Sequence, residues 1–156
     1  MPVSPEEFRN ALQRFASGVT VVTVSTGREL HGMTASSFAS VSLEPPLVLV
    51  CLDQASRTRT LIDEIGSFAV SILSESQADA SRAFSQRGVK PFDSLAHHLG
   101  KLGHPLLDES IAWIECRVHE VFEAGDHHIV IGEVEACEPR DGAPLLYFDQ
   151  TYRSLS

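Results

Sequence analysis

Apolar residues recur at helical spacing near the start of the chain, directly after a typical helix-start pattern. The segment 4–7, Ser-Pro-Glu-Glu, has Ser at the N-cap, Pro at the first helical position and Glu at the third, which forms a capping box. The apolar positions that follow are Phe8, Leu12, Phe15 and Ala16. Gly18 comes next, and glycine commonly ends helices. We therefore expect an amphipathic helix that ends at Gly18.

Strand patterns dominate the rest of the chain. Runs rich in Val, Ile and Thr predict β-strands over 19–25, 29–33, 37–43, 47–52, 68–72, 111–122 and 129–137, and a last apolar stretch covers 144–148. The segments 26–28 and 123–128 are expected to turn the chain between paired strands. Short helices are expected over 56–66, with Ser56 as N-cap, and over 77–86. The segment 88–105 is expected to be irregular or partly helical.

These elements predict a mainly β fold with capping helices. Seven or so strands with three short helices between them are typical of a closed or nearly closed antiparallel barrel. The sequence has no strand followed by a glycine-rich dinucleotide loop, which argues against a Rossmann unit. It also has no repeat, low-complexity tract or linker, so we expect a single domain over 1–156.

Charge limits the partners of this chain. The formal net charge is −9, so the surface as a whole repels nucleic acid and anionic membranes. An anionic ligand would need local basic residues, either Arg57 with Arg59 or Arg82 with Arg87 and Lys90. Each of these side chains could equally be an ordinary solvated cation.

The expected location is the cytoplasm. The start of the chain has neither a basic leader nor an apolar segment of the kind found in signal peptides. No apolar run approaches the roughly 20 residues of a membrane helix. The three cysteines are widely spaced, which favours reduced thiols over a disulfide framework or a zinc site.

The segment 32–53 carries the clearest functional signal. A run of small hydroxyl residues precedes the Pro45-Pro46 break, and a continuous apolar strand follows it. Small side chains let a flat or polyanionic ligand approach the backbone, where hydroxyl and N–H groups can donate to its oxygens. A plain Ser/Thr turn that bonds its own backbone is the alternative. We expect the segment to form one wall of a ligand site in the barrel.

Four groups of residues, in order over nearly the whole chain, resemble the short-chain flavin reductases of two-component flavin monooxygenases. They are Phe15 to Thr23, Gly32 to Phe38, Ser40 to Leu43 with Pro45-Pro46-Leu47, and Gly125-Asp126-His127 with Ile129 and Gly132-Glu133-Val134. The resemblance implies an FMN-binding split β-barrel of antiparallel, Greek-key type that works as a homodimer. It also implies hydride transfer from NADH or NADPH to FMN or FAD, with the reduced flavin passed to a separate monooxygenase.

The resemblance also implies roles for individual residues. Met33, Thr34, Ala35, Ser36 and Ser37 would line the flavin ring and its ribityl chain, and Cys51, Leu52 and Asp53 would approach the other edge of the ring. Ser56, Arg57 and Thr58 begin a predicted helix, where free N–H groups attract a phosphate. Phe84, Ser85 and Arg87 could close over the phosphate or an adenylate. His127 would act at the nicotinamide as the catalytic residue, and Tyr152 would reach the flavin or nicotinamide region.

Other chemistries remain open at this point. His97, His98 and His104 could be metal ligands, but solvated loop histidines are the better interpretation, and we predict no metal. A non-catalytic barrel that carries flavin or haem is the main alternative function, with His127 or His98 as an axial ligand. A flavin-dependent oxidase is a weaker one.

Overall fold

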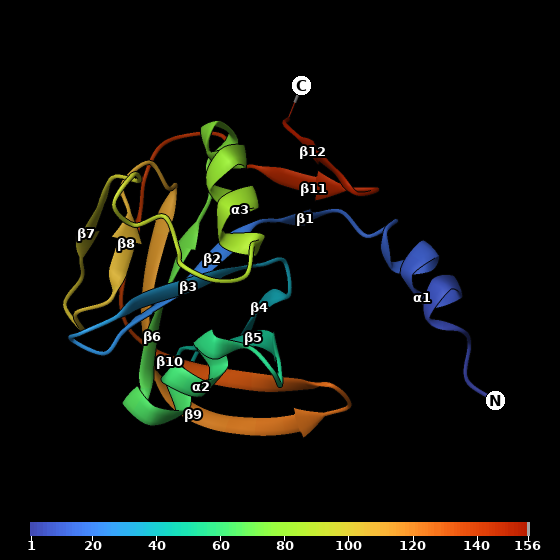
Figure 1. The fold of residues 1–156 in the computed structure, drawn as a ribbon, viewed down its shortest axis with the longest axis horizontal. Coiled ribbons are helices and arrows are strands. Elements are labelled where there is room, and N and C mark those ends of the chain that lie inside the picture. Colours follow the sequence, from blue (N-terminus) through green and yellow to red (C-terminus); the bar gives the residue numbers. More distant parts are fainter. Residues whose placement is uncertain (156) are drawn as a thin grey trace.

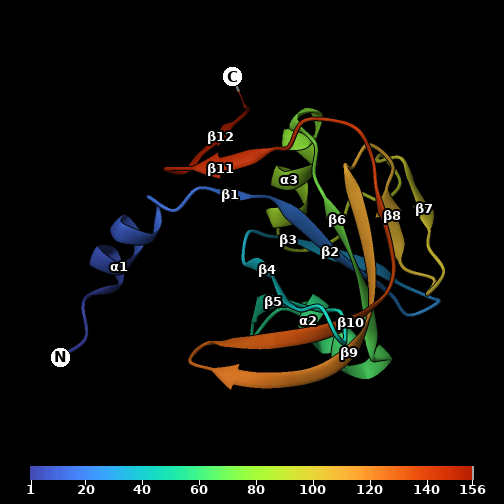
Figure 2. The ribbon, with the colours of Figure 1, turned by 180° about the vertical axis from the view of Figure 1, so that it is seen from behind.

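Seven antiparallel strands form the main sheet of the computed structural model, which describes residues 1–155. Their order across the sheet is β3-β2-β6-β9-β10-β5-β4, and Figures 1 and 2 show the sheet curling around a central core. The strands are β2 (Thr20–Ser25), β3 (Leu30–Ala35), β4 (Phe38–Ser42), β5 (Leu47–Asp53), β6 (Ser67–Ile72), β9 (Ala112–Ala124) and β10 (His127–Pro139). The predicted mainly β, antiparallel fold is confirmed.

The barrel is split between its two edge strands. β3 and β4 lie at opposite edges of the sheet although only Ser36 and Ser37 separate them in the chain. The chain therefore crosses from one edge to the other within the hydroxyl-rich segment. The split thus opens where the sequence places its ligand wall.

The barrel interior is filled by apolar side chains from alternate strand positions. On β2, Val22 and Val24 point into this interior, while Val21 belongs to a second apolar cluster that includes Phe84. Both faces of β2 are therefore covered, which explains why the strand is buried almost throughout, its threonines included.

Two helices cover the barrel. α2 (Arg57–Ile65) packs Leu61 and Ile62 into the interior, and α3 (Ala78–Ser85) follows a single 3₁₀ turn, η1 (Glu75–Gln77). Gly66 ends α2 in the left-handed conformation, at φ 80°. The helices predicted over 56–66 and 77–86 are confirmed within a few residues.

Two small sheets complete the fold. One joins β1 (Ser17–Gly18), β11 (Leu146–Phe148) and β12 (Thr151–Arg153), and the other joins β7 (His97–Leu99) to β8 (Pro105–Leu107). β7 lies inside the segment 88–105, which was predicted to be irregular, and β8 begins at its last residue. The pattern of this hairpin is short and rich in histidine and glycine, and tertiary hydrogen bonds hold the hairpin in place. One of these runs from the Thr23 hydroxyl to the Pro105 carbonyl, at 2.6 Å.

The first helix is shorter than predicted. α1 (Pro5–Leu12) has the expected capping box at Ser4 and Glu7, but it ends at Leu12 instead of Gly18. Ser17 and Gly18 pair with β11, which takes them out of the helix. α1 buries none of its residues and stands apart from the sheets in both Figure 1 and Figure 2. Within residues 1–155, no helix has the length and apolar character to cross a membrane.

Candidate functional site

A cavity of about 430 Å³ lies where β3, the start of α2 and the end of α3 meet. This volume falls within the range of about 300–1,000 Å³ that is usual for small-molecule sites. Nine of the residues predicted to bind cofactor line it, namely Met33, Thr34, Asp53, Ser56, Arg57, Thr58, Phe84, Ser85 and Arg87. The fold thus brings together residues that are more than fifty positions apart in the chain.

The start of α2 forms one wall. Ser56 caps the helix, since its hydroxyl oxygen accepts from the Arg59 N–H at 3.2 Å. The same hydroxyl donates to the Met33 sulfur at 3.1 Å, which ties the helix start to β3. The first N–H groups of a helix have no partner within the helix, so this wall offers backbone donors to an anion.

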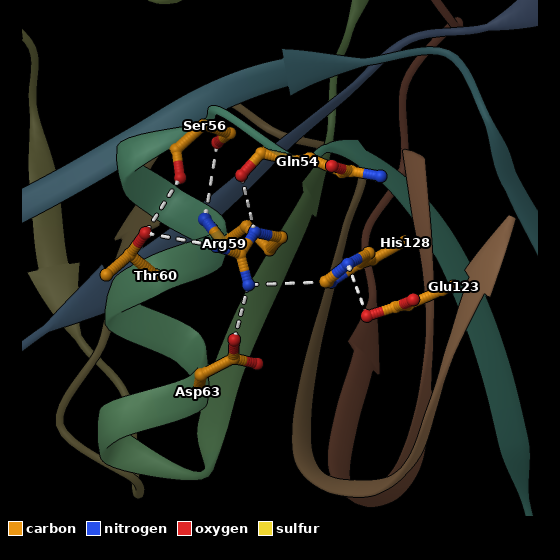
Figure 3. A network of polar contacts seen from close by, with 7 residues as sticks. All are labelled: Gln54, Ser56, Arg59, Thr60, Asp63, Glu123 and His128. Carbon is orange, nitrogen blue, oxygen red and sulfur yellow. Dashed lines mark hydrogen bonds and ion pairs between the residues drawn. The ribbon is translucent and has the colours of Figure 1, made fainter. Parts of the chain in front are cut away.

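Arg59 holds this wall in position. Figure 3 shows its side chain lying between α2 and the β9–β10 hairpin, directed toward His128 and Asp63. The guanidinium donates to the Gln54 carbonyl at 2.9 Å and to Asp63 at 2.5 Å. Gln54 in turn donates to the Gly125 carbonyl at 2.7 Å, at the tip of the hairpin. Arg59 is therefore structural, and the expected pairing of Arg57 with Arg59 in one basic cluster is wrong.

Three cations from both predicted groups meet in the cavity instead. Arg57 comes from α2, while Arg87 and Lys90 follow α3. Arg57 is paired with Glu29 at 3.1 Å. Asp53 is the acidic residue that lines the cavity, and its carboxylate accepts from the Ala55 N–H at 2.8 Å. The cavity is therefore basic in a chain that is acidic overall.

The hydroxyl groups of the wall were expected to donate to a ligand, but in the structure they donate to the protein itself. Thr34 and Ser85 both donate to the Ser81 carbonyl, at 2.6 and 2.8 Å, and Ser37 donates to the Cys51 carbonyl at 3.0 Å. Their protons are already used, so these oxygens can only accept from a ligand. These three hydroxyl groups therefore cannot donate to a flavin oxygen or phosphate, whereas backbone N–H groups, the basic side chains and the Gln86 amide can.

Two further hollows lie nearby, of which only the smaller shares lining residues with the cavity. This one, of about 210 Å³, shares Thr34 and Ser85 with it and is also lined by Ser36 and Tyr152. The Tyr152 hydroxyl is 2.6 Å from the Ser81 hydroxyl, so the C-terminal strand is fastened to α3. The other, of about 590 Å³, includes Ser36 and Ser37 and reaches α1.

Four predicted site residues lie outside these hollows. Ala35 and Leu52 have side chains buried in the barrel core, so only their backbone could meet a ligand. Cys51 uses its backbone N–H and carbonyl in bonds to Ser37. His127 is the first residue of β10 and not part of the turn. It is half-exposed, and its Nδ1 lies 2.8 Å from Asp126.

Sequence reasoning missed five residues that line the cavity. They are His31, Ala55, Gln86, Gly88 and Lys90, of which only Lys90 entered the sequence argument, as a basic residue. A period-two pattern could have indicated His31, because it precedes Met33 by two positions on the same strand.

The loop histidines do not gather around a metal. His97 contacts the Leu95 carbonyl, His98 pairs with Asp108 at 2.7 Å, and His104 is buried between Ser25 and Ser67. Among residues 1–155, no three His, Cys, Asp or Glu side chains are arranged to hold a metal ion.

Known proteins are similar to this chain in sequence and in fold. The model of the flavin reductase like domain matches residues 12–156. A reductase component of 4-hydroxyphenylacetate 3-monooxygenase from Thermus thermophilus is 41% identical over 96% of both chains. A probable flavin reductase from Rhizobium meliloti is 45% identical over 86% of this chain, which spans only 43% of that relative.

A solved structure extends the comparison to the fold. The NADH:FAD oxidoreductase SgcE6 of Streptomyces globisporus, in complex with NAD and FAD fragments, superposes with a TM-score of 0.92 at 37% identity. The match covers 100% of this chain and 97% of that one. The split barrel, its basic cavity and these matches agree: the chain belongs to the flavin reductase-like domain family.

Proposed function

We propose that this flavin reductase binds FMN or FAD in the basic cavity and reduces it with NADH or NADPH. The observation that carries the proposal is the meeting of Arg57, Arg87 and Lys90 around the free start of α2, in a chain of net charge −9. Cations and helix N–H groups together favour a phosphate-bearing ligand.

The residues of the cavity suit a flavin on two counts. Met33 supplies apolar surface for a flat ring, with Phe84 fully buried behind the wall, while the basic residues and the start of α2 suit a phosphate. Thr34 and Ser85 present oxygens that can accept from the ribityl hydroxyls, because their own protons go to Ser81. The cavity thus offers apolar, accepting and basic groups to match the three parts of a flavin nucleotide.

Hydride passes from C4 of the nicotinamide to N5 of the flavin in this chemistry, and a proton from solvent completes the reduction. The protein needs no nucleophile or strong base for such a step. Its residues contribute by binding and orienting the two substrates and by excluding water. Backbone N–H groups beside the hydroxyl wall favour the negative charge that develops on the reduced ring.

His127 is proposed to act on the nicotinamide side. It lies opposite Asp53 in the β5–β10 pairing, and Asp53 lines the cavity. Its bond to Asp126 orients the ring without burying it. The β9–β10 hairpin that carries it is tied to α2 by Gln54 and Arg59, so both substrates would be held by one connected framework.

A second copy of the chain is proposed to cover α1. Phe8, Leu12 and Phe15 are 56%, 51% and 77% exposed, which is unusual for three apolar side chains on one segment. They line the hollow of about 590 Å³ that also contains Ser36 and Ser37. A partner seated there would border the flavin site, in keeping with the homodimer that the family resemblance implies.

The reduced flavin is proposed to pass to a separate monooxygenase, and the location is proposed to be the cytoplasm. The cavity is open to solvent at its basic end, since Arg57 and Arg87 are both exposed, which suits a flavin that is released after reduction. The relative from Thermus thermophilus, a reductase component by name, supports this role.

Anaerobic turnover tests the proposal. Purified protein is mixed with NADH or NADPH and with FMN or FAD, and the loss of the reduced-nicotinamide absorbance is followed. We expect rapid oxidation of at least one nicotinamide that depends on added flavin. No acceleration over the protein-free mixture for any pair would contradict the proposal, and tight flavin or haem binding without turnover would favour a carrier.

A further inference from the structure

We infer that His31 and Lys90 together recognise the flavin phosphate and make the reductase select FMN and FAD over riboflavin. Both residues line the cavity, and neither is among the residues that the family resemblance supplied. The inference rests on the proposed function, since it concerns the same cavity.

His31 is held so that one ring nitrogen faces the protein. Its Nδ1 lies 2.7 Å from the hydroxyl of Thr58, which is fully buried in the first turn of α2. A hydroxyl can donate to Nδ1 of a neutral ring or accept from Nδ1–H of a charged one. The contact therefore survives a change of charge, and Nε2 is left for the cavity.

Lys90 is fixed where the chain leaves α3. Its ammonium donates to the carbonyls of Phe84, at 3.3 Å, and of Gln86, both at the C-terminal end of α3. An ammonium has three N–H donors, so one remains for a ligand. Within residues 1–155, no ion pair neutralises Lys90, while Arg57 is engaged by Glu29. Lys90 is thus a positioned and uncompensated charge.

The hydroxyl groups cannot take over this task. Thr34 and Ser85 have already donated their protons to Ser81, and the Ser56 proton goes to Met33. Phosphate oxygens accept hydrogen bonds and donate none when ionised. His31, Lys90, the arginines and the Gln86 amide are therefore the side chains lining the cavity that can donate to a phosphate, and of these Lys90 and the arginines carry a permanent positive charge.

The charges around His31 link its protonation to the ligand. Burial lowers the pKa of His31, Lys90 from beyond α3 and Arg57 from α2 lower it further, and Glu29 raises it. An anion placed among these cations reverses their effect and favours the charged ring. Binding of a phosphate should therefore bring a proton to His31.

Acceptor preference tests the inference. FMN, FAD and riboflavin are compared as acceptors for wild type, His31→Gln, Lys90→Gln and Lys90→Arg. Lys101→Gln is the matched control, because Lys101 lies in a different hollow and its loss changes the net charge equally. We expect Lys90→Gln to raise KM for FMN roughly tenfold with kcat and the riboflavin KM little changed. Lys90→Arg should keep most of the preference, and Lys101→Gln all of it.

The pH dependence separates His31 from Lys90. FAD has no phosphate proton that titrates near neutrality, so its preference over riboflavin should grow from about pH 8 to about pH 6 as His31 takes up a proton. His31→Gln should abolish this growth. Circular dichroism and thermal unfolding establish that each variant is folded.

Equilibrium binding tests the same assignment without turnover. Dissociation constants for FMN and riboflavin come from the quenching of flavin fluorescence by the oxidised protein. The inference would be overturned if His31→Gln and Lys90→Gln lost equal affinity for FMN and for riboflavin, or lost affinity for neither flavin. If the wild type binds FMN much more tightly than riboflavin but oxidises neither NADH nor NADPH, the proposed function fails while the phosphate assignment stands.

Discussion

Gly132 in β10 shows how tightly single residues are fixed inside the barrel. A Cβ atom at this position would lie 2.7 Å from Cys116 Cβ and 2.7 Å from Phe68 Cζ. Cys116 Cβ is fixed by the backbone of the neighbouring strand, and the Phe68 ring is fully buried, so neither atom can move away without disturbing the packing around it. Lack of space for a side chain therefore explains the glycine at this position, which lies next to the register shift between Ile131 and Gly132.

We predict that Gly132→Ala lowers the free energy of unfolding by about 1–3 kcal/mol because it overpacks the core. Urea denaturation measures the change. Gly18→Ala is the control, since nothing lies within 4 Å of a Cβ built at Gly18. An equal effect of both substitutions would contradict the packing argument.

Gln150 occupies the opposite kind of position. It has a φ of 61° in the turn between β11 and β12, a conformation that costs a residue with a side chain about 1 kcal/mol. Gln150→Gly should therefore raise the thermal midpoint slightly, whereas Gln150→Ala should not. Differential scanning calorimetry checks both, and a loss of stability in the glycine variant would show that the Gln150 side chain matters more than the strain.

His104 makes the stability of the fold depend on pH. Its Nδ1 accepts from the Ser25 N–H at 2.9 Å and its Nε2 lies 2.7 Å from the Ser67 hydroxyl, so the folded protein holds the ring neutral. Burial lowers the pKa of His104, although Glu115 partly opposes this effect. As pH falls below about 6.5, the unfolded chain takes up a proton that the folded protein refuses.

The free energy of unfolding should consequently fall with acidification, by up to about 1.4 kcal/mol per pH unit for this one group. His104→Gln should be less stable at neutral pH but should show a flatter pH profile. The profile should not become level, because the pKa of His31 is lowered as well. Urea denaturation from about pH 7.5 to pH 5 measures both proteins, and parallel profiles would refute the assignment.

Among the helices and strands, α2 both packs into the barrel core and forms a wall of the cavity. Ser56 caps the helix and contacts Met33, while Leu61 and Ile62 anchor the helix in the barrel. The start of α2 is therefore held by its own core residues, and its free N–H groups keep their direction. α1 has a capping box of the same kind but buries nothing.

The two caps should therefore respond differently to the same change. Ser56→Ala should cost about 1 kcal/mol of stability and raise KM for flavin, because it loosens the helix start at the cavity. Ser4→Ala should leave KM unchanged. Urea denaturation and steady-state kinetics distinguish the two variants. An unchanged flavin KM in Ser56→Ala would show that the start of α2 does not contribute to flavin binding.

Local patterns predict most elements well, because period-two apolar runs and helix caps are properties of neighbouring residues. Ser56 and Gly66 mark the ends of α2 in the sequence as they do in the structure. The end of α1 could not be predicted, since pairing of Ser17 with β11 depends on residues more than a hundred positions away. β7 and β8 pair locally, but they were missed because their short pattern is weak and contacts with distant residues, such as the Thr23 hydroxyl, hold the hairpin in place.

The residue types of the site could be predicted from the sequence, but the orientations of their side chains could not. The sequence indicates a hydroxyl wall beside basic residues, and nine predicted residues do line one cavity. Distant acceptors such as the Ser81 carbonyl set the orientation of the hydroxyl groups, and contacts with the β9–β10 hairpin draw Arg59 away from Arg57. Tertiary structure alone supplies that information.

For the molecule as a whole, the exposed apolar side chains on and after α1 suggest an interface with a second copy of the chain. We predict a dimer for the wild type and a monomer for the Phe8→Glu, Phe15→Glu double variant, because burying two carboxylates in an apolar interface is costly. Light scattering coupled to gel filtration measures the mass. Leu99→Glu, which alters an exposed apolar residue on β7, should remain dimeric. A monomeric wild type would contradict the prediction.

A crystal structure of the protein soaked with FMN would show directly whether the basic cavity is the flavin site. We predict the phosphate at the start of α2, within hydrogen-bonding reach of His31 and Lys90, and the ring along the wall that contains Met33 and Thr34. FMN bound elsewhere on the protein, or a phosphate facing away from these basic side chains, would contradict this assignment.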